Sequence, residues 1–551
     1  EWSKYDPRPE DGVRLENRAG GVVKQGRFGP TQIVDCIQGS YAAFDFSDVR
    51  QPGQYRVVWP GGETGWFPIR ESVFEDRLWQ PTLDYFVPFQ MCHADVDLGD
   101  AVTGHPRCHM DDAARVPAHF RGPDGFVSFE AEGTPYEAGE HIPCAKGGWH
   151  DAGDCDVNVH ANGFATWTLA LACEEFGIDR DVATLDVEAQ TFAAGRPDGV
   201  PDIVQQVEWG AVWLLSMQQA DGRVYNGVCA NQPQRGGKPL GQIHDGRPGT
   251  GDERQLYVDY HADVQLVHAI SLSAASRVLR QARPALADRC IEAAKKSFAF
   301  FRRNEPVYRR GGYAASAPKG KEDDAMAIAA AVELYLTTGE GQYVAVVREL
   351  AGSLPGLEFD WPFPRQAGTG GFWYCAPFLA RLYPRLPDGP LKETVLAACR
   401  RAAEKKAQRT GVRPWPFLWY HFGQWGNTGT CTARAFDVYW LSRVAPDLLP
   451  PELVLRNMFW IFGLHPTCDT VFVCGLGYPE PLHLYSGHLR ELFGYAPAGI
   501  PGAVVPGMGG FWHSGVIAYA DEHGNYGHNE ACIYTQAQYI FAVNAMKKLG
   551  F

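Results

Sequence analysis

The stretch GGWHDAGDCDVNVHANGFATWTLALACEEF, residues 147–176, joins a glycine-rich polar segment to a long run of mostly apolar residues. In its second part, 157–176, apolar residues recur at i, i+3 and i+4, which predicts a helix. The same spacing predicts eleven more helices, over 84–93, 201–219, 260–282, 284–303, 323–338, 341–353, 371–384, 390–408, 430–444, 452–462 and 529–548. Twelve helices are the number that an (α/α)6 barrel needs, and the regular strand–helix alternation of doubly wound sheets and TIM barrels is missing. We therefore expect a mainly α fold with an (α/α)6 barrel.

Residues 1–76 have a different pattern from the helical region that follows. Short segments separated by Gly, Pro, Asp and Asn predict strands over 12–17, 21–26, 42–46 and 53–59. A β-sandwich of the immunoglobulin type usually has about seven strands. We therefore expect the remaining strands to be missing before the first residue, unpaired, or contributed by another segment. The predicted domains are a small β-sandwich of residues 1–76 and a barrel of residues 77–551.

Composition limits the classes of partner. The 551 residues carry a net charge of -14 and no long run of Lys or Arg. Binding to a phosphate backbone depends on clustered cations, so we expect no nucleic acid partner. No stretch approaches about 20 uninterrupted apolar residues, so no membrane span is expected. An acidic chain with 13% aromatic residues suits neutral sugars, whose ring faces stack on Trp and Tyr.

The cellular compartment stays open. The first residues have neither the cationic start nor the apolar segment of a signal peptide, so either such a peptide was removed or none existed. Fourteen cysteines at irregular spacing do not indicate a disulfide framework in so long a chain. A secreted or periplasmic location is slightly favoured, and a cytoplasmic one stays an alternative.

Three carboxylic acids are the candidates for chemistry. Asp151 and Asp154 follow two glycines, and Glu530 lies far away in NYGHNEA, residues 525–531. Cleavage of a glycosidic bond needs one carboxyl group that protonates the leaving oxygen and a second that activates water. An Asp-x-x-Asp pair alone is more often a helix cap, a calcium ligand or solvated surface. The combination with a distant glutamate indicates glycoside hydrolysis.

Residues 147–154 resemble the Gly-Gly-Trp-(Tyr/His)-Asp-Ala-Gly-Asp signature of family 9 glycoside hydrolases, the inverting cellulase family, and residues 526–530 resemble its Tyr-x-x-Asn-Glu motif. Further similar segments are 199–203, 322–325, 329–335 and 462–466, and residues 44–55 resemble the immunoglobulin-like module that precedes many of these enzymes. The resemblance implies that Glu530 is the general acid, Asp154 the base and Asp151 the residue that positions the attacking water. At the start of the last predicted helix, Glu530 would need apolar surroundings that outweigh the helix dipole.

A candidate metal site consists of Cys92, Cys108, His109 and His150. Two thiolates and two imidazoles suit a tetrahedral structural zinc, but their spacing is unlike a zinc finger and is more typical of buried cysteines. In several family 9 enzymes with the immunoglobulin-like module, zinc is bound by a Cys, a later Cys-His pair and the His directly before the first Asp of the signature. That resemblance implies structural zinc on these four residues. The substitutes would be His93, His141 and Cys144.

Calcium is a second candidate cofactor. The family often has Pro-Asp-x-x-Asp-Glu after its second helix, whereas this chain has PDIVQQ at 201–206. The change removes two carboxylates, the hard anionic ligands that Ca²⁺ prefers. We expect this particular site to be absent, with Asp198 and Asp202 as capping residues, while calcium elsewhere in the chain stays an alternative.

Sugar contacts are expected from the long Gly-, Pro- and aromatic-rich loops, because such loops are usually functional. The candidate residues are Trp373, Trp419, Trp425, Trp512 and Tyr526, with His483 and Asn427 as polar contacts. Each tryptophan taken alone fits a core position better. His483 lies in Pro-Leu-His-Leu where the family usually has Pro-His-x-Arg, and the nearest replacement for that arginine is Arg490.

These features predict inverting hydrolysis of β-1,4-glycosidic bonds in glucan-type oligo- or polysaccharides. One alternative is an exo-acting β-glucosidase or β-glucosaminidase, because the long segment between His109 and His150 could close one end of the cleft. Another alternative is an inactive carbohydrate-binding protein with the same fold.

Overall fold

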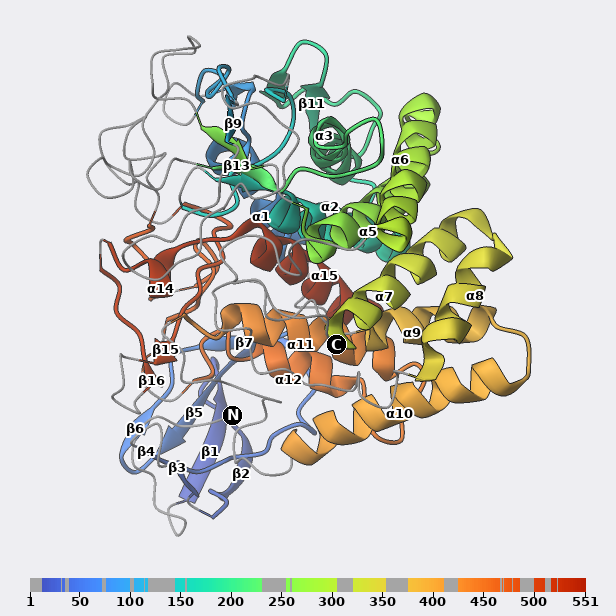
Figure 1. Cartoon of the computed structure of the whole chain (residues 1–551). Coiled ribbons are helices and arrows are strands. Elements are labelled where there is room, and N and C mark those ends of the chain that lie inside the picture. The colour runs from blue at the N-terminus through green and yellow to red at the C-terminus, as the bar shows by residue number, and fades with distance from the viewer. Residues whose placement is uncertain are drawn as a thin grey trace.

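The chain forms a small β module followed by a large helical domain (Figure 1). The computed structural model describes residues 12–30, 32–34, 39–71, 76–99, 104–112, 114–116, 144–153, 156–229, 254–257, 260–304, 321–352, 375–410, 425–465, 468, 470–477, 479–485, 500–510, 517–522 and 524–551. Asp154, His141, Trp373, Trp419, Arg490 and Trp512, all named above, lie outside these ranges.

The N-terminal module contains seven strands within its described part: β1 (Gly12–Asn17), β2 (Val22–Arg27), β3 (Gln32–Val34), β4 (Gly39–Tyr41), β5 (Gly53–Trp59), β6 (Gly62–Glu63) and β7 (Phe67–Ile69). β2, β1, β5 and β6 form an antiparallel sheet in that order, β7 also pairs with β5, and β3 pairs with β4. The module has its own core, in which Leu15, Phe44 and Trp59 are buried. The four strands that the sequence did not reveal have only two or three residues each, too few for a recognisable alternation.

One of the predicted strands, 42–46, is wrong. Ala42 and Phe44 are buried and alternate with exposed neighbours, which explains why the sequence resembles a strand. The carboxylate of Asp45 accepts hydrogen bonds from the backbone N–H and the hydroxyl of Ser47. Pairing in this segment is limited to Ala43, a single bridge residue whose carbonyl accepts the backbone N–H of Gly29 at 2.8 Å.

Each of the twelve predicted helical segments contains a helix. The helices are α1 (Gln80–Gln90), α2 (Val159–Phe176), α3 (Asp202–Ser216), α5 (Ala262–Leu279), α6 (Pro284–Arg303), α7 (Lys321–Thr338), α8 (Gly341–Glu349), α9 (Ala376–Leu382), α10 (Pro390–Thr410), α11 (Thr428–Leu441), α12 (Glu452–Met458) and α15 (Ile533–Leu549). Three shorter helical segments are η1 (Asp76–Leu78), η3 (Tyr383–Arg385) and α14 (Tyr526–Asn529).

Contacts between helices close an inner ring. Each inner helix contacts the next in the order α2, α5, α7, α9, α11 and α15, and α15 contacts α2 again. Helices α2, α11 and α15 are buried on nearly all sides, as an inner layer requires, whereas α6 buries one stripe and exposes the other. Outer helices follow inner ones along the chain, so the predicted (α/α)6 barrel is confirmed (Figure 1).

The inner helices α2 and α15 run in the same direction. At one end of this pair, the backbone N–H of Ile533 donates to the carbonyl of Asp151, which precedes α2. At the other end, the ammonium group of Lys548 lies 3.5 Å from the carbonyl of Glu175. The segments that precede α2 and α15, which carry the two sequence motifs, therefore meet at the same end of the barrel.

Short strands form three small sheets in the helical domain. One sheet has the order β10 (Val157–Asn158), β13 (Gly227–Cys229), β14 (Gln255–Tyr257) and β9 (Ala114–Val116), and β10 leads directly into α2. Two smaller sheets contain β11 (Ala183–Asp186), β12 (Thr191–Ala194) and β8 (Asp95–Asp97), and β15 (Gly509–Gly510) with β16 (Ile517–Ala518).

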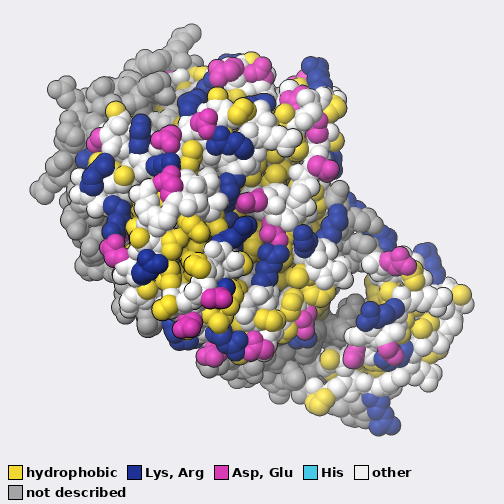
Figure 2. Space-filling model, turned by 90° about the vertical axis from the view of Figure 1, so that its right-hand side faces the viewer, with side chains coloured by type: hydrophobic (Ala, Val, Ile, Leu, Met, Phe, Trp, Pro, Cys, Tyr) yellow, Lys and Arg dark blue, Asp and Glu magenta, His cyan; other side chains and the backbone are white. Residues whose placement is uncertain are grey.

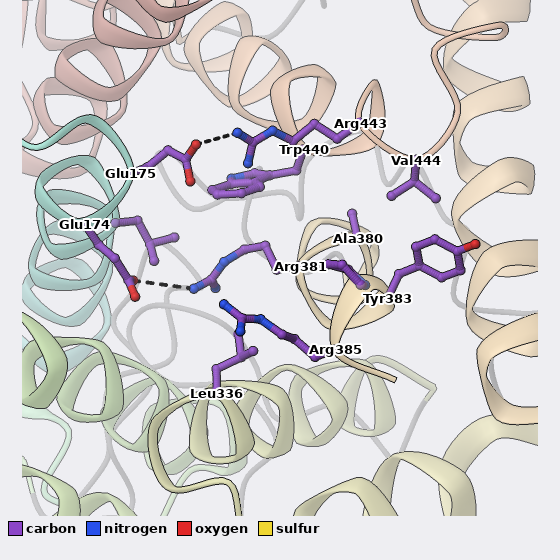
Figure 3. A pocket seen from close by; sticks show the side chains of 12 residues that line it. Glu174, Glu175, Leu336, Ala380, Arg381, Tyr383, Arg385, Trp440, Arg443 and Val444 are labelled. Atoms are coloured by element: carbon purple, nitrogen blue, oxygen red, sulfur yellow. Dashed lines mark hydrogen bonds and ion pairs between the residues drawn. The ribbon is translucent and has the colours of Figure 1, made fainter. Parts of the chain in front are cut away.

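A cavity of about 520 Å³ lies at the opposite end of α2 (Figure 3). Four of its charged side chains form two pairs: Arg443 bonds to Glu175 at 2.5 Å, and Arg381 lies 3.9 Å from Glu174. The two arginines also lie over the ring of Trp440. This cavity is thus remote from the two motifs, and its charges are used to hold the helix ends together.

The surface in Figure 2 mixes basic and acidic side chains over the described part of the helical domain, with apolar side chains between them. Within the described ranges, no helix combines the length and the apolar composition needed to cross a bilayer.

Candidate active site

The two motifs meet at Glu530. Its side chain is buried, with 6% of the residue exposed, and Oε1 accepts a hydrogen bond of 3.0 Å from the backbone N–H of Gly153. Glu530 follows α14 and precedes α15, which begins at Ile533, four residues after the predicted start at residue 529. Its own backbone is extended, and its N–H donates to the carbonyl of Tyr526. Glu530 therefore lies before the last helix rather than in its first turn.

Asp151 lies beside this contact and is partly buried. Its carboxylate accepts a hydrogen bond of 2.6 Å from the side-chain amide of Asn158, and its backbone N–H donates to the carbonyl of Asp156. Its carbonyl accepts from Ile533, the first residue of α15. The backbone of Asp151 is thus hydrogen-bonded both to Asp156 and to the first residue of the last inner helix. Asp154, the predicted base, lies in this segment but outside the described residues.

The glycines of the motif allow close packing against neighbouring backbone. Gly147 and Gly148 have φ values of +79° and +81°, and a Cβ at Gly147 would lie 2.6 Å from the carbonyl oxygen of Trp209 in α3. A Cβ at Gly153 would lie 2.2 Å from the carbonyl oxygen of Tyr485. The glycines therefore fit the motif between α3 and the segment that carries Tyr485.

Aromatic side chains line the approach to Glu530. Tyr526 is 41% exposed, and its ring contacts Trp425 at 5.9 Å and Tyr485 at 6.0 Å between centroids. The backbone N–H of Tyr485 donates to the carbonyl of Asn529, next to Glu530. Tyr485 was not predicted, although it stands two residues after His483, and in extended chain such residues point to the same side. That spacing is the signal that could have identified it.

Asp521 is a second residue that the sequence did not reveal. Its carboxylate accepts the backbone N–H groups of Leu482 at 2.9 Å and His483 at 3.0 Å, and Nδ1 of His483 lies 3.4 Å from Oδ2. The His483 side chain remains 39% exposed. Asp521 therefore fixes both the backbone and the ring of a predicted sugar contact. Its identification needs the fold, because 38 residues separate it from His483.

The segment that carries Asp521 is attached to the acid motif. The hydroxyl of Tyr519 donates to the side-chain oxygen of Asn529 at 2.7 Å, and the amide of Asn529 donates to the carbonyl of Ala520. The N–H of Ala520 donates to Nδ1 of His528, so this nitrogen carries no proton. Burial lowers the pKa of His528 to about 4, which keeps the ring neutral. Asp521, His483 and Glu530 are thus held in one hydrogen-bonded unit.

The predicted polar contact Asn427 lies inside the fold. It is fully buried, and its side-chain amide and backbone N–H both donate to the carbonyl of Met508. Asn427 therefore ties the start of α11 to the loop before β15 and does not face solvent. Its role as a polar contact to the sugar stays a prediction. Trp425, two residues earlier, is partly exposed and contacts Tyr526.

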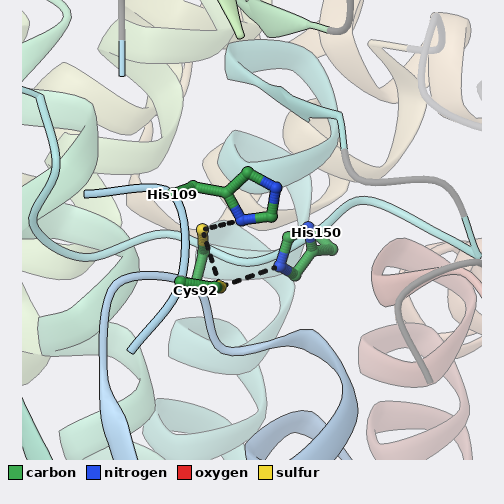
Figure 4. Close-up of side chains that lie close together, drawn as sticks. Cys92, His109 and His150 are labelled. Carbon is green, nitrogen blue, oxygen red and sulfur yellow. Dashed lines mark hydrogen bonds between the residues drawn. The ribbon is translucent and has the colours of Figure 1, made fainter. Parts of the chain in front are cut away.

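The four residues proposed as metal ligands come together in the structure. The ligand atoms of Cys92, Cys108, His109 and His150 all lie within 4.8 Å of one another, and all four residues are buried (Figure 4). Sγ of Cys92 lies 3.7 Å from Sγ of Cys108 and 3.8 Å from Nδ1 of His109, and Sγ of Cys108 lies 3.7 Å from Nε2 of His150.

These distances fit a metal ion. Zinc bonds of about 2.3 Å to sulfur and 2.0–2.1 Å to nitrogen place tetrahedral ligand atoms roughly 3.4–3.8 Å apart. Burial and the neighbouring Cys108 raise the pKa of the Cys92 thiol well above its ordinary value. A divalent cation reverses this effect, because a coordinating thiol is deprotonated. The geometry and the donor set therefore form a site that could hold a metal.

The alternative ligands are placed differently. Nδ1 of His93 lies 2.8 Å from the carbonyl oxygen of Gly147, and its Nε2 lies 3.0 Å from the carboxylate of Asp112. Burial alone would lower the pKa of His93, but Cys92 and Asp112 raise it to about 10. A ring that donates from both nitrogens cannot bind a metal. Cys144 is buried outside the four-residue cluster.

The metal cluster is attached to the motif at two points. His150 directly precedes Asp151, and the backbone N–H of Cys92 donates to the carbonyl of Gly148 at 3.1 Å. Residues Met91 and Trp149 also form an isolated β-bridge. The position of the backbone before Asp151 therefore depends directly on the cluster.

In segment 201–206, where the family often has a calcium-binding motif, the side-chain amide of Gln205 donates hydrogen bonds to several oxygen atoms. Nε2 of Gln205 donates to Oδ1 of Asp198 at 2.9 Å, to the carbonyl of Val200 at 3.1 Å and to the carbonyl of Ala183 at 3.3 Å. Asp202 accepts the backbone N–H of Ala183. These oxygens are bonded to groups of the chain itself.

Comparisons with known proteins support the same assignment. A family model described as "Glycosyl hydrolase family 9" matches residues 99–543. "Endoglucanase D" of Acetivibrio thermocellus is 23% identical over 506 residues, 91% of this chain and 74% of that protein. "Cellodextrinase" of Butyrivibrio fibrisolvens is 24% identical over 359 residues, 62% of this chain and 56% of that protein. The solved structure of a Zn-binding triple mutant of the family 9 endoglucanase J30 superposes with a TM-score of 0.76 and 22% identity, covering 97% of this chain and 96% of that one. The family match spans well over half of the chain, which therefore belongs to glycosyl hydrolase family 9.

Proposed function

We propose that this family 9 glycoside hydrolase cleaves β-1,4-glycosidic bonds within glucan chains and inverts the configuration at the anomeric carbon. The observation that carries the proposal is the hydrogen bond from Gly153 to Glu530, which joins the two motifs. Inversion needs two carboxyl groups on opposite sides of the sugar, separated by enough room for a water molecule. The names of the relatives, endoglucanase and cellodextrinase, support a β-1,4-glucan substrate.

Each carboxyl group has a role in the proposed reaction. Glu530 gives its proton to the leaving oxygen, and the donated N–H of Gly153 holds the carboxyl group in one orientation. Asp154 removes a proton from water as the water attacks the anomeric carbon. Asp151, held by the amide of Asn158, accepts a hydrogen bond from that water. Glu530 is buried, so most of its surface is shielded from bulk water.

Aromatic side chains bind the sugar rings. The exposed face of Tyr526 and the neighbouring rings of Trp425 and Tyr485 form an aromatic surface beside Glu530. The apolar face of a glucose ring stacks on such a surface, while its hydroxyls bond to polar groups such as His483. Trp373, Trp419 and Trp512 remain candidates for further sugar positions.

The cysteine and histidine cluster binds zinc in this proposal. A closed set of two thiolates and two imidazoles leaves no open position for substrate, so the metal is structural. When bound, zinc supplies the positive charge that keeps the two thiols deprotonated. The chain itself transmits the effect, because His150 fixes the backbone next to Asp151.

The product profile on cellohexaose tests the proposed function. Internal cleavage should release cellotriose, cellobiose and cellotetraose early in the reaction, and the Glu530→Gln variant should serve as the inactive control. Early release of glucose alone or cellobiose alone would contradict internal cleavage and indicate exo-action at chain ends. Binding of cellohexaose without any product would contradict catalysis and indicate a carbohydrate-binding protein.

A further inference from the structure

A group of charged side chains is buried next to Cys92 of the metal cluster. The side chains of Arg254, Asp112 and His93 have no exposed surface. Nε of Arg254 donates to Oδ1 of Asp112 at 3.0 Å, and its Nη2 donates to Oδ2 of the same carboxylate. The same Nη2 lies 3.0 Å from Sγ of Cys92. The guanidinium group thus bonds to a carboxylate and to a candidate metal ligand at once.

The group also reaches the catalytic motif. Asp112 lies three residues after His109, and its backbone N–H donates to the carbonyl of that ligand. Its carboxylate accepts from His93, whose other ring nitrogen donates to the carbonyl of Gly147. Arg254 directly precedes β14, so it links the sheet of β10, β13, β14 and β9 to the same centre.

We propose that Arg254 is a positioning residue of the metal centre, which donates a hydrogen bond to the metal-bound thiolate of Cys92 while its bond to Asp112 fixes the guanidinium in place. The proposal rests on the metal centre proposed above. A guanidinium is planar and always charged, so its fork can bond a carboxylate in two places and still direct an N–H at a neighbouring sulfur. A hydrogen bond to a thiolate orients the sulfur and balances part of its charge.

Outer residues that orient metal ligands typically change metal affinity by 10–100-fold when they are replaced. The Arg254→Met variant keeps the length of the side chain but loses the N–H groups and the charge. We expect its zinc dissociation constant, measured by competition with a chromophoric chelator, to rise by about 10–100-fold. Arg254→Lys keeps the charge and one donor group, and its loss of affinity should be smaller.

Arg381→Met is the matched control. Arg381 is also nearly buried and pairs with the fully buried Glu333, but it lies near the cavity at the opposite end of α2. Its replacement should lower stability by breaking a buried ion pair and should leave the zinc dissociation constant unchanged. A similar loss of zinc affinity in both variants would show a general loss of stability and overturn the role of Arg254.

If Arg254→Met does not fold, the cobalt-substituted Arg254→Lys variant decides the question. A changed hydrogen bond to the thiolate should shift the sulfur-to-cobalt charge-transfer band relative to the wild-type protein. An unchanged band together with unchanged affinity would overturn the proposal. Wild-type protein that binds neither Zn²⁺ nor Co²⁺ would contradict the metal centre itself, whereas a metal-binding wild type whose Arg254→Met variant has the same affinity contradicts only the role of Arg254.

Discussion

The backbone N–H of Gly153 lies 3.0 Å from Oε1 of Glu530, although 377 residues separate them in the chain. They meet because α2 and α15 are neighbours in the inner ring and start at the same end of the barrel. The contact also requires glycine, since a Cβ at position 153 would lie 2.2 Å from the carbonyl oxygen of Tyr485. The topology of the barrel therefore assembles a site from two distant motifs.

Replacement of Asp521 by Asn should weaken the sugar contact of His483. Asparagine is uncharged and has one acceptor oxygen, so it cannot bind both backbone N–H groups and the His483 ring as the carboxylate does. His483 therefore loses its fixed position. One or two lost hydrogen bonds correspond to roughly 1–2 kcal/mol, or about a 5- to 30-fold loss in kcat/KM on cellohexaose. The same substitution in a His483→Ala background should have little further effect. Two fully additive losses would show that Asp521 does not act through His483.

Metal removal should affect stability before chemistry. Protein purified without chelator should contain about one equivalent of zinc, and its removal should lower the melting temperature because the four buried ligands lose their shared cation. Cys108→Ser should reproduce the low melting temperature without chelator, and added zinc should not restore it. Protein free of zinc with an unchanged melting temperature would contradict a structural metal.

Acid should destabilise the fold through His268. This ring is neutral in the fold, with Nε2 donating to the carbonyl of Leu214 and Nδ1 accepting from Ser297, and burial lowers its pKa to about 4 from the ordinary 6.5. On acidification the unfolded chain therefore binds the proton first. The contribution of neutral His268 to the free energy of unfolding is fully present above pH 6.5 and falls between pH 6.5 and about 4. Below about pH 4 this group causes no further change.

Between pH 7 and pH 5, titration of His268 should lower the free energy of unfolding by on the order of 2 kcal/mol. Urea unfolding of the wild type and of His268→Gln at these two values measures it. Glutamine keeps a donor for Leu214 and does not titrate, so its stability should depend less on pH. Equal pH dependence in both proteins would rule out His268 as the responsible group.

The stereochemistry of the first product should show inversion. Water that attacks from the side opposite the leaving group converts a β-linkage into an α-anomer. Proton NMR of cellohexaose during the first minutes of hydrolysis, before mutarotation, should therefore show α-anomeric reducing ends. An initial β-anomer would indicate a retaining mechanism with a covalent intermediate.

The helical part of the fold was predictable because most of its helices are long enough to repeat their apolar spacing several times, although α9 and α12 have only seven residues each. The strands β3, β4, β6 and β7 were not, since two or three residues carry no period. The segment 42–46 shows the opposite error, because burial alternates there although Ala43 alone pairs, as a single bridge residue. Local pattern is therefore informative in this chain only where an element is long.

The candidate site shows the same limit. Glu530 and the four cysteine and histidine residues could be proposed from their resemblance to family motifs, which local sequence carries. Asp521 and Arg254 were not, because each acts through a partner that is distant in the chain, His483 or Cys92. The bond of Asn427 to the carbonyl of Met508 likewise becomes visible only in the fold.

The central claim is that Glu530 protonates the leaving oxygen, and the kinetics of Glu530→Gln on two substrates test it most directly. Glu522→Gln, an exposed neighbour of the same loop, is the control. On cellohexaose, whose leaving group needs a proton, kcat should fall by about 10² to 10⁴. On 2,4-dinitrophenyl β-cellobioside, whose leaving group departs without a proton, the loss should be much smaller. Normal turnover of cellohexaose, or an equal loss on both substrates, would contradict this role of Glu530.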